Sequence, residues 1–182
     1  EGRELLYRLA KECDVLLTNF RQDARRKLRI DPEDIRAHNP NIIYVRGTGY
    51  GARGPEVQRG GYDAAAYWMR SGHGFVFTKP DADLATMQRP AYGDVMGGLN
   101  IAGAISAALY RRATTGEPSI VDVSLLGTGM WQLGPDIMNA GVSPESVGAQ
   151  HDRKATWNPI VGTYKTRDGR FLHLNMMEGD RY

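Results

Sequence analysis

Hydrophobic and polar positions along the chain follow two periods, one typical of helices and one typical of strands. Residues 3–11 carry leucines at helical spacing, and residues 14–19 follow as a short apolar run of strand length. The same order returns with a helix-start signature, an Asp cap followed by Pro, at residues 31–34 and a β-rich run at residues 41–47. Because helices and strands alternate, we predict an α/β fold with a parallel sheet.

The second half of the chain continues the alternation. The pattern predicts a helix over residues 62–72, an irregular loop over 73–93, a long small-residue helix that ends at Gly116, a strand over 119–126, and a hairpin that turns at 167–169. Residues 134–158 have the Gly, Pro, Ser and Asn content of a linker. We therefore expect residues 1–133 to be part of a large domain, 134–158 to be a linker, and 159–182 to begin a small domain.

Charge and cysteine content narrow the class of protein. Lys and Arg number 23 against 21 Asp and Glu, a formal net charge of +2, and this balance does not favour a nucleic-acid binder. The single cysteine, Cys13, rules out an internal disulfide framework, and the first residues contain no apolar signal segment, so we expect a cytoplasmic location. Glycines and polar residues interrupt the most apolar stretch, residues 95–110, which argues against a membrane span.

One acidic residue, Asp94, stands directly before the small-residue helix. The structural interpretation is that its carboxylate caps the helix by accepting hydrogen bonds from backbone N–H groups. The chemical interpretation is that the helix N-terminus keeps the carboxylate ionised, while Gly97 and Gly98 leave room for a bulky ligand. An ionised, accessible carboxylate can act as a nucleophile, so position alone leaves both interpretations open.

A second cluster of candidate residues follows the first predicted strand. Asn19, Phe20 and Arg21 bring an amide, an aromatic ring and a guanidinium to its carboxyl end, the edge where open parallel sheets bind ligands. The ring and Arg21 can stack on an adenine, and a phosphate can meet one of the cations that follow, Arg25, Arg26, Lys27 and Arg29. The alternative is that these cations form a solvated helix face. The four histidines lack metal-ligand spacing, so we expect no metal site.

Five blocks of the sequence, in order and over nearly the whole chain, resemble the family III CoA-transferases of the CaiB/BaiF type. The blocks read DVLLTNFR, NPNIIYVRGTGYGARGP, GYDAAAYWMRSG, GDVMGGLNIAGAISAALYRRATTGEPSIVDVSLL and YKTRDGRFLHLN. This group includes formyl-CoA and carnitinyl-CoA transferases and α-methylacyl-CoA racemase. The resemblance implies a Rossmann-like large domain, a smaller second domain, and two chains that interlock as a homodimer. It also implies a longer protein, and we expect this chain to be a fragment because residue 1 already lies within a helical pattern.

The resemblance assigns roles to individual residues. It implies that Asp94 is the catalytic nucleophile, that Asn19, Phe20 and Arg21 approach the CoA adenine, and that Lys27 stands at the position of a phosphate-binding arginine. The expected CoA-binding set is therefore Asn19, Phe20, Arg21, Lys27, Gly97 and Gly98.

The implied activity is transfer of coenzyme A from an acyl-CoA to a carboxylic acid through an aspartyl-CoA intermediate. CoA and acyl-CoA are then substrates, and neither a metal nor a tightly bound cofactor is expected. Two alternatives stay open, an α-methylacyl-CoA racemase or epimerase and a non-catalytic CoA-binding module. Racemisation needs two titratable groups, and the racemases carry Gly-His-Asp where this chain has Gly61, Tyr62 and Asp63, which favours transfer.

Overall fold

The computed structural model describes residues 1–79, 81–144 and 158–178. The chain forms two compact units, Glu1–Gly148 and Ala149–Tyr182. The expected linker, residues 134–158, spans the boundary between the units, and its residues 145–157 lie outside the described part of the chain. The roles that the sequence assigns to the three parts stay predictions.

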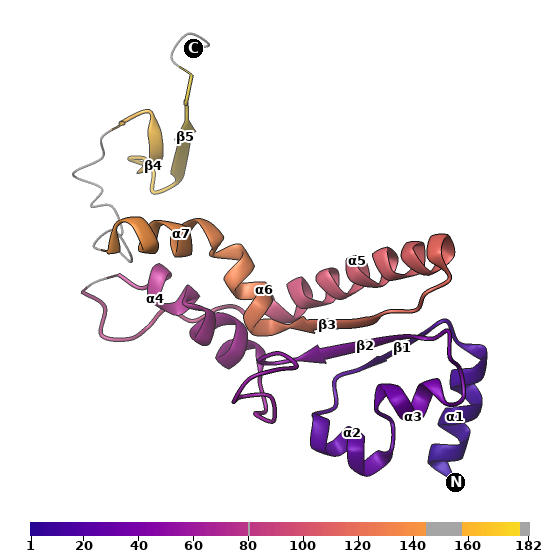
Figure 1. Ribbon diagram of the computed structural model, residues 1–182. Helices are drawn as coiled ribbons and strands as arrows, with labels where there is room; N and C mark the ends of the chain where they lie inside the picture. The colour runs from indigo at the N-terminus through magenta and orange to yellow at the C-terminus, as the bar shows by residue number, and fades with distance from the viewer. Residues whose placement is uncertain (80, 145–157, 179–182) are drawn as a thin grey trace. The chain divides into compact units, whose positions relative to one another are not determined.

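The first unit is built from helices around a parallel sheet (Figure 1). Its strands are β1 (Val15–Thr18), β2 (Ile43–Thr48) and β3 (Ile120–Ser124), in the order β1-β2-β3. Its helices are α1 (Gly2–Glu12), α2 (Gln22–Leu28), α3 (Pro32–Arg36), η1 (Asp63–Met69), α4 (His73–Phe77), α5 (Tyr92–Thr115), α6 (Leu125–Gln132) and α7 (Gly134–Val142). Both strand pairs are parallel, which confirms the predicted α/β class.

The central strand β2 is buried on both faces, and successive side chains enter different cores. Tyr44 packs in a cluster with Ala10 of α1 and Ile35 of α3. Ile43 packs on the other face with Ala108 of α5. Because successive residues of a strand point to opposite faces, an unbroken apolar run allows helices to cover both sides of the sheet. The carboxyl ends of the parallel strands therefore meet at one edge, which is where the candidate site lies.

Three segments of the first unit differ from the sequence prediction. The predicted helix over residues 62–72 is a π-helix, η1, over Asp63–Met69, followed by a turn and then by α4 within the expected irregular loop. The beginning of the expected linker is helix α7, which carries Pro135 in its first turn. Proline is tolerated there because the first N–H groups of a helix have no intrahelical acceptor, so its presence does not exclude a helix.

The second unit contains a hairpin of β4 (Val161–Lys165) and β5 (Phe171–Asn175), paired antiparallel. Gly169 has a φ of 84°, and the Thr166 N–H donates to the carbonyl of Arg170. The left-handed conformation is the one that glycine adopts without strain, so the predicted turn at residues 167–169 is confirmed. Among the described residues, no helix is long and apolar enough to cross a membrane.

Candidate active site

A cavity of about 720 Å³ lies at the carboxyl end of the sheet in the first unit. Its wall includes the loop after β1, the loop after β2, the first turns of α5 and the end of β3. Six of the seven residues that the sequence nominated contribute to it: Asn19, Phe20, Arg21, Asp94, Gly97 and Gly98. The structure therefore brings together two segments that are separated by more than seventy positions in the sequence.

Asp94 lies in the first turn of α5, but it is not the capping residue. Ala91 occupies the N-cap position with a φ of 60°, and Asp94 is the third residue of the helix. The interpretation that Asp94 is the N-cap of this helix is therefore wrong. The side chain is exposed at the cavity wall, yet partial loss of water raises its pKa above the ordinary range, and the charge of Asp63 raises it further. This shift opposes the expected effect of the helix N-terminus, which favours the ionised form.

Asp63 supplies a second carboxylate to the cavity. It begins η1 and is only 9% exposed. Its Oδ1 accepts a hydrogen bond of 3.0 Å from the N–H of Gly93, at the start of α5. Its Oδ2 is buried and has no hydrogen-bond partner among the described residues. A buried carboxylate oxygen without a donor is costly, so a ligand donor at this position would stabilise the site.

Glycines at the start of α5 serve different purposes. A Cβ on Gly93 would lie 2.2 Å from Cγ of Tyr67 and 2.5 Å from Oδ1 of Asp63, so only glycine fits between the helix and η1. A Cβ on Gly98 would meet no atom of the described residues within 4 Å, although Gly98 lines the cavity. A Cβ on Gly97 would lie 3.4 Å from Cδ2 of Leu125, so of these two glycines only Gly98 borders open space, and occupation of that space by a ligand stays a prediction.

The loop that follows β1 and the first turn of α2 are tied to the loop that follows β2 through Gln58. The Gln58 carbonyl accepts from Nη1 of Arg21 at 3.5 Å, and its Oε1 accepts from the N–H of Asp23 at 3.2 Å. The Gln58 amide also donates to Oε1 of Gln22 at 2.9 Å. Phe20 stays half exposed at the cavity. Two loops that are distant in the sequence therefore form one wall of the site.

Lys27 is exposed on α2 and is not among the residues that line the cavity, so its phosphate contact stays a prediction. Two other cations line the cavity, Arg25 and Arg59. Arg59 donates to Oε1 of Glu56 at 2.6 Å and lies 5.2 Å from the ring centroid of Tyr50. Hydrogen bonds from Arg59, and then from Arg70, hold the pKa of Glu56 below its ordinary range. Sequence reasoning missed Arg59 because it lies in a glycine-rich loop with no periodicity.

No group of three or more His, Cys, Asp or Glu side chains in the described part of the chain could hold a metal ion. The polar side chains that line the cavity carry amides, hydroxyls, guanidinium groups and two carboxylates. These groups suit an anionic ligand with hydrogen-bonding edges and a reacting carbonyl.

The model of CoA-transferase family III matches residues 1–182, and the chain belongs to this family. It is 32% identical over 177 residues to a protein of Clostridium sporogenes named cinnamoyl-CoA:phenyllactate CoA-transferase. It is also 28% identical over 200 residues to a human protein named alpha-methylacyl-CoA racemase. The resemblance stated from the sequence blocks is thus confirmed.

Among solved structures, the chain resembles a crystal structure of a CaiB/BaiF family protein from Brucella suis. The TM-score is 0.77 with 32% identity, and the match covers 93% of this chain and 44% of that chain. The match covers 97% of this chain and 42% of the Clostridium sporogenes protein, and 100% of this chain and 47% of the human protein. The chain therefore spans less than half the length of these relatives.

Proposed function

We propose that the protein transfers coenzyme A from an acyl-CoA donor to a carboxylic acid acceptor, with Asp94 as the nucleophile. The observation that carries the proposal is the shared cavity: Asp94 at the start of α5 and the Asn19 to Arg21 segment after β1 line the same space. A carboxylate beside a candidate nucleotide-binding loop is the arrangement that such a reaction needs. CoA and acyl-CoA are substrates in this proposal, and no tightly bound cofactor takes part.

The chemistry divides into two exchanges. The Asp94 carboxylate attacks the donor thioester carbonyl, the C–S bond breaks, and CoA leaves as a thiolate from a mixed anhydride. The thiolate then attacks the aspartyl carbonyl, which releases the donor acid as a carboxylate and leaves an aspartyl-CoA thioester. The acceptor carboxylate repeats these steps in reverse and regenerates Asp94. Each exchange begins and ends with a CoA thioester, so the free energy of the thioester bond is conserved and no external energy source is required.

The other nominated residues take binding roles in this proposal. Asn19, Phe20 and Arg21 contact the adenine of CoA, and Lys27 contacts a phosphate. Backbone N–H groups of the loop of residues 47–51, which lines the same cavity, donate to the developing oxyanion of each tetrahedral intermediate, because the N–H groups of Gly97 and Gly98 lie beyond the first turn of α5. The support for these roles is the position of the loop and of the helix start at one cavity.

The test is replacement of the nucleophile in the full-length protein. Asp94→Asn keeps the size of the side chain but removes the nucleophilic oxygen pair, so transfer should be abolished while the fold is retained. Asp83→Asn removes an exposed carboxylate outside the cavity and is the matched control. Mass spectrometry of wild-type protein incubated with acyl-CoA should detect CoA on the peptide that contains Asp94. Transfer by Asp94→Asn within severalfold of wild type would exclude the proposal.

A second candidate function is racemisation of a 2-methylacyl-CoA. It is favoured by the human racemase relative and by Asp63, a second carboxylate in the cavity with Asp94. A racemase must break the Cα–H bond, whereas a transferase leaves it intact. In heavy water without an acceptor acid, we expect no deuterium in the 2-methylacyl-CoA. Rapid incorporation would overturn the transfer proposal and would assign the second proton carrier to Asp63.

Two features of the proposal concern the whole protein. We expect an interlocked homodimer, as the family resemblance implies, and a cytoplasmic location, which the single cysteine favours. Light scattering of the full-length protein at several concentrations should give a constant dimer mass. A mass that falls to that of one chain on dilution argues against interlocked chains, which cannot separate without unfolding.

A further inference from the structure

Arg25 is buried, although the three residues that follow it on α2 are exposed. The sequence has four cations between residues 25 and 29, a pattern that is typical of a solvated helix face. Arg25 is only 4% exposed, whereas the side chain of Arg26 is 67% exposed. Burying a guanidinium is costly unless its N–H groups find acceptors. The acceptors of Arg25 therefore show which segments it joins.

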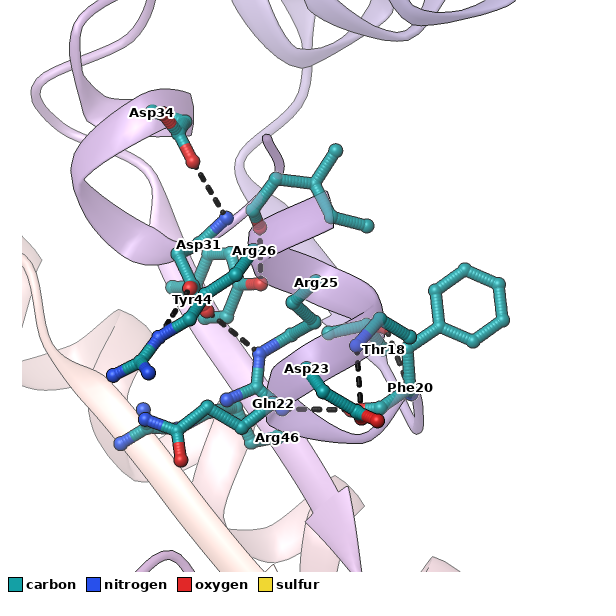
Figure 2. Close-up of polar contacts among 12 residues, drawn as sticks. Thr18, Phe20, Gln22, Asp23, Arg25, Arg26, Asp31, Asp34, Tyr44 and Arg46 are labelled. Atoms are coloured by element: carbon teal, nitrogen blue, oxygen red, sulfur yellow. Dashed lines mark hydrogen bonds and ion pairs between the residues drawn. The ribbon is translucent and has the colours of Figure 1, made fainter. Parts of the chain in front are cut away.

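The guanidinium of Arg25 joins two separate elements (Figure 2). Its Nε donates to Oδ1 of Asp31, at the start of α3, at 2.9 Å. Its Nη1 donates to the carbonyl of Phe20, in the loop after β1, at 2.6 Å. Asp31 is itself fixed, because its N–H donates to Oδ2 of Asp34 at 3.1 Å in a capping box. Arg25 therefore anchors the loop to a rigid helix start.

The contact with Phe20 fixes the backbone from which the ring projects. The Phe20 N–H donates to Oγ1 of Thr18 at 3.1 Å, and its carbonyl accepts from Arg25. Both polar groups of the Phe20 backbone are thus held, while its side chain remains 50% exposed and lines the cavity. An exposed ring on a fixed backbone is prepared for stacking, since little further ordering is needed when a ligand binds.

We propose that Arg25 is a positioning residue for the adenosine part of CoA. It acts through the Phe20 carbonyl, by setting the loop of residues 19–21 against the start of α3. The inference rests on the proposed binding of CoA at this loop. It adds that the affinity for the nucleotide end of CoA depends on Arg25. Since the loop contacts only the nucleotide end of CoA in this scheme, Arg25 affects binding of that end and leaves the reaction at Asp94 unchanged.

The test compares two substrates in the full-length protein. Acyl-CoA contains the nucleotide, whereas the acyl-pantetheine thioester with the same acyl group lacks it. Loss of a charged hydrogen bond in Arg25→Leu should raise the KM for acyl-CoA about tenfold with kcat nearly unchanged. The kcat/KM for acyl-pantetheine should stay at the wild-type value. Arg25→Lys should give an intermediate KM, because an ammonium group lacks the planar fork that spans both acceptors.

Arg26→Leu is the matched control. It removes the same charge from the next position of α2, and Arg26 approaches the same Asp31 at 3.9 Å, but in the described part of the chain no hydrogen bond joins Arg26 to Phe20. Its KM for acyl-CoA should stay within about twofold of wild type, as expected for an exposed ion pair.

The outcomes separate this inference from the proposed function. An equal loss of kcat/KM for both substrates, or a KM for Arg25→Leu no higher than that for Arg26→Leu, overturns the positioning role. If Arg25→Leu does not fold, Arg25→Lys decides by the same comparison. Wild-type protein that binds CoA but does not transfer it refutes the proposed function alone. In that case the Kd values of the variants for CoA and for pantetheine are compared in place of the KM values. Wild-type protein that binds no CoA refutes both.

Discussion

Two carboxylates of the cavity, Asp94 and Asp63, should give the reaction a characteristic pH dependence. Partial desolvation raises the pKa of Asp94, and the charge of Asp63 raises it further. The nucleophile must be ionised, so kcat/KM should fall as the pH decreases through this raised pKa. Asp63→Asn removes the neighbouring charge, lowers the pKa of Asp94, and should move the acidic limb of the profile to lower pH. Asp83→Asn is the control for loss of an exposed charge. If the acidic limb of Asp63→Asn does not move, the charge of Asp63 does not affect the pKa of Asp94.

Two glycines of α5 offer a matched test of the ligand site. Gly98 lines the cavity and Gly103 does not, and a Cβ at either position would meet no atom of the described residues within 4 Å. Replacement by Ala in a helix interior should stabilise the protein by roughly 0.5–1 kcal/mol in both cases. Only Gly98→Ala should weaken binding of acyl-CoA, measured as a several-fold higher KM. Equal effects at the two positions would remove Gly98 from the ligand site.

The sequence identified the residues of the cavity whose position follows from local pattern. Asp94 and Gly98 stand at a recognisable helix start, and Asn19 to Arg21 stand at the end of a recognisable strand. The burial of Arg25 was not predictable, because a charge run on a short helix is typical of a solvated face. Its burial depends on the Phe20 carbonyl and on Asp31, which only the tertiary fold brings to one guanidinium.

At the scale of elements, the start of α5 is determined by packing against η1. A Gly-Asp pair before a small-residue run is compatible with a helix capped by Asp94, yet the N-cap is Ala91, three residues earlier. The reason is contact with a neighbour, since Gly93 fits against the Tyr67 ring and its N–H donates to Asp63. Period and composition also did not distinguish an α-helix from the π-helix of η1, because that difference lies in the backbone hydrogen bonds.

This contact between α5 and η1 makes Gly93→Ala a severe substitution. The added Cβ would lie 2.2 Å from Cγ of Tyr67 and 2.5 Å from Oδ1 of Asp63, and both side chains are buried. We expect a loss of roughly 1–3 kcal/mol in the free energy of unfolding, as for overpacked cores, measured in urea. Because Asp94 follows directly, kcat should fall as well. Gly103→Ala in the same helix is the control, and an equal stability of the two variants would contradict the close packing.

At the scale of the whole molecule, the first unit exposes apolar surface and sheet edges. Val95, Leu99 and Tyr110 are large exposed side chains along α5. Strands β1 and β3 are the outer strands of the sheet in the described part of the chain. Large apolar patches and open sheet edges are uncommon on independent monomers. The Clostridium sporogenes relative has more than half of its length outside the matched region. We therefore expect these surfaces to be covered in the full-length protein.

Residues 1–182 expressed alone should show whether these surfaces need a cover. The polypeptide should bind an apolar dye such as ANS strongly and should associate, because the face of α5 and the edges of the sheet stay accessible. Val95→Lys combined with Leu99→Lys should reduce the dye fluorescence severalfold. Ser106→Lys combined with Ala107→Lys adds the same charge at exposed positions of the same helix that carry little apolar surface, and it should leave the fluorescence nearly unchanged. A monomer that binds no dye and unfolds in one cooperative transition would mean that the exposed face of α5 needs no cover.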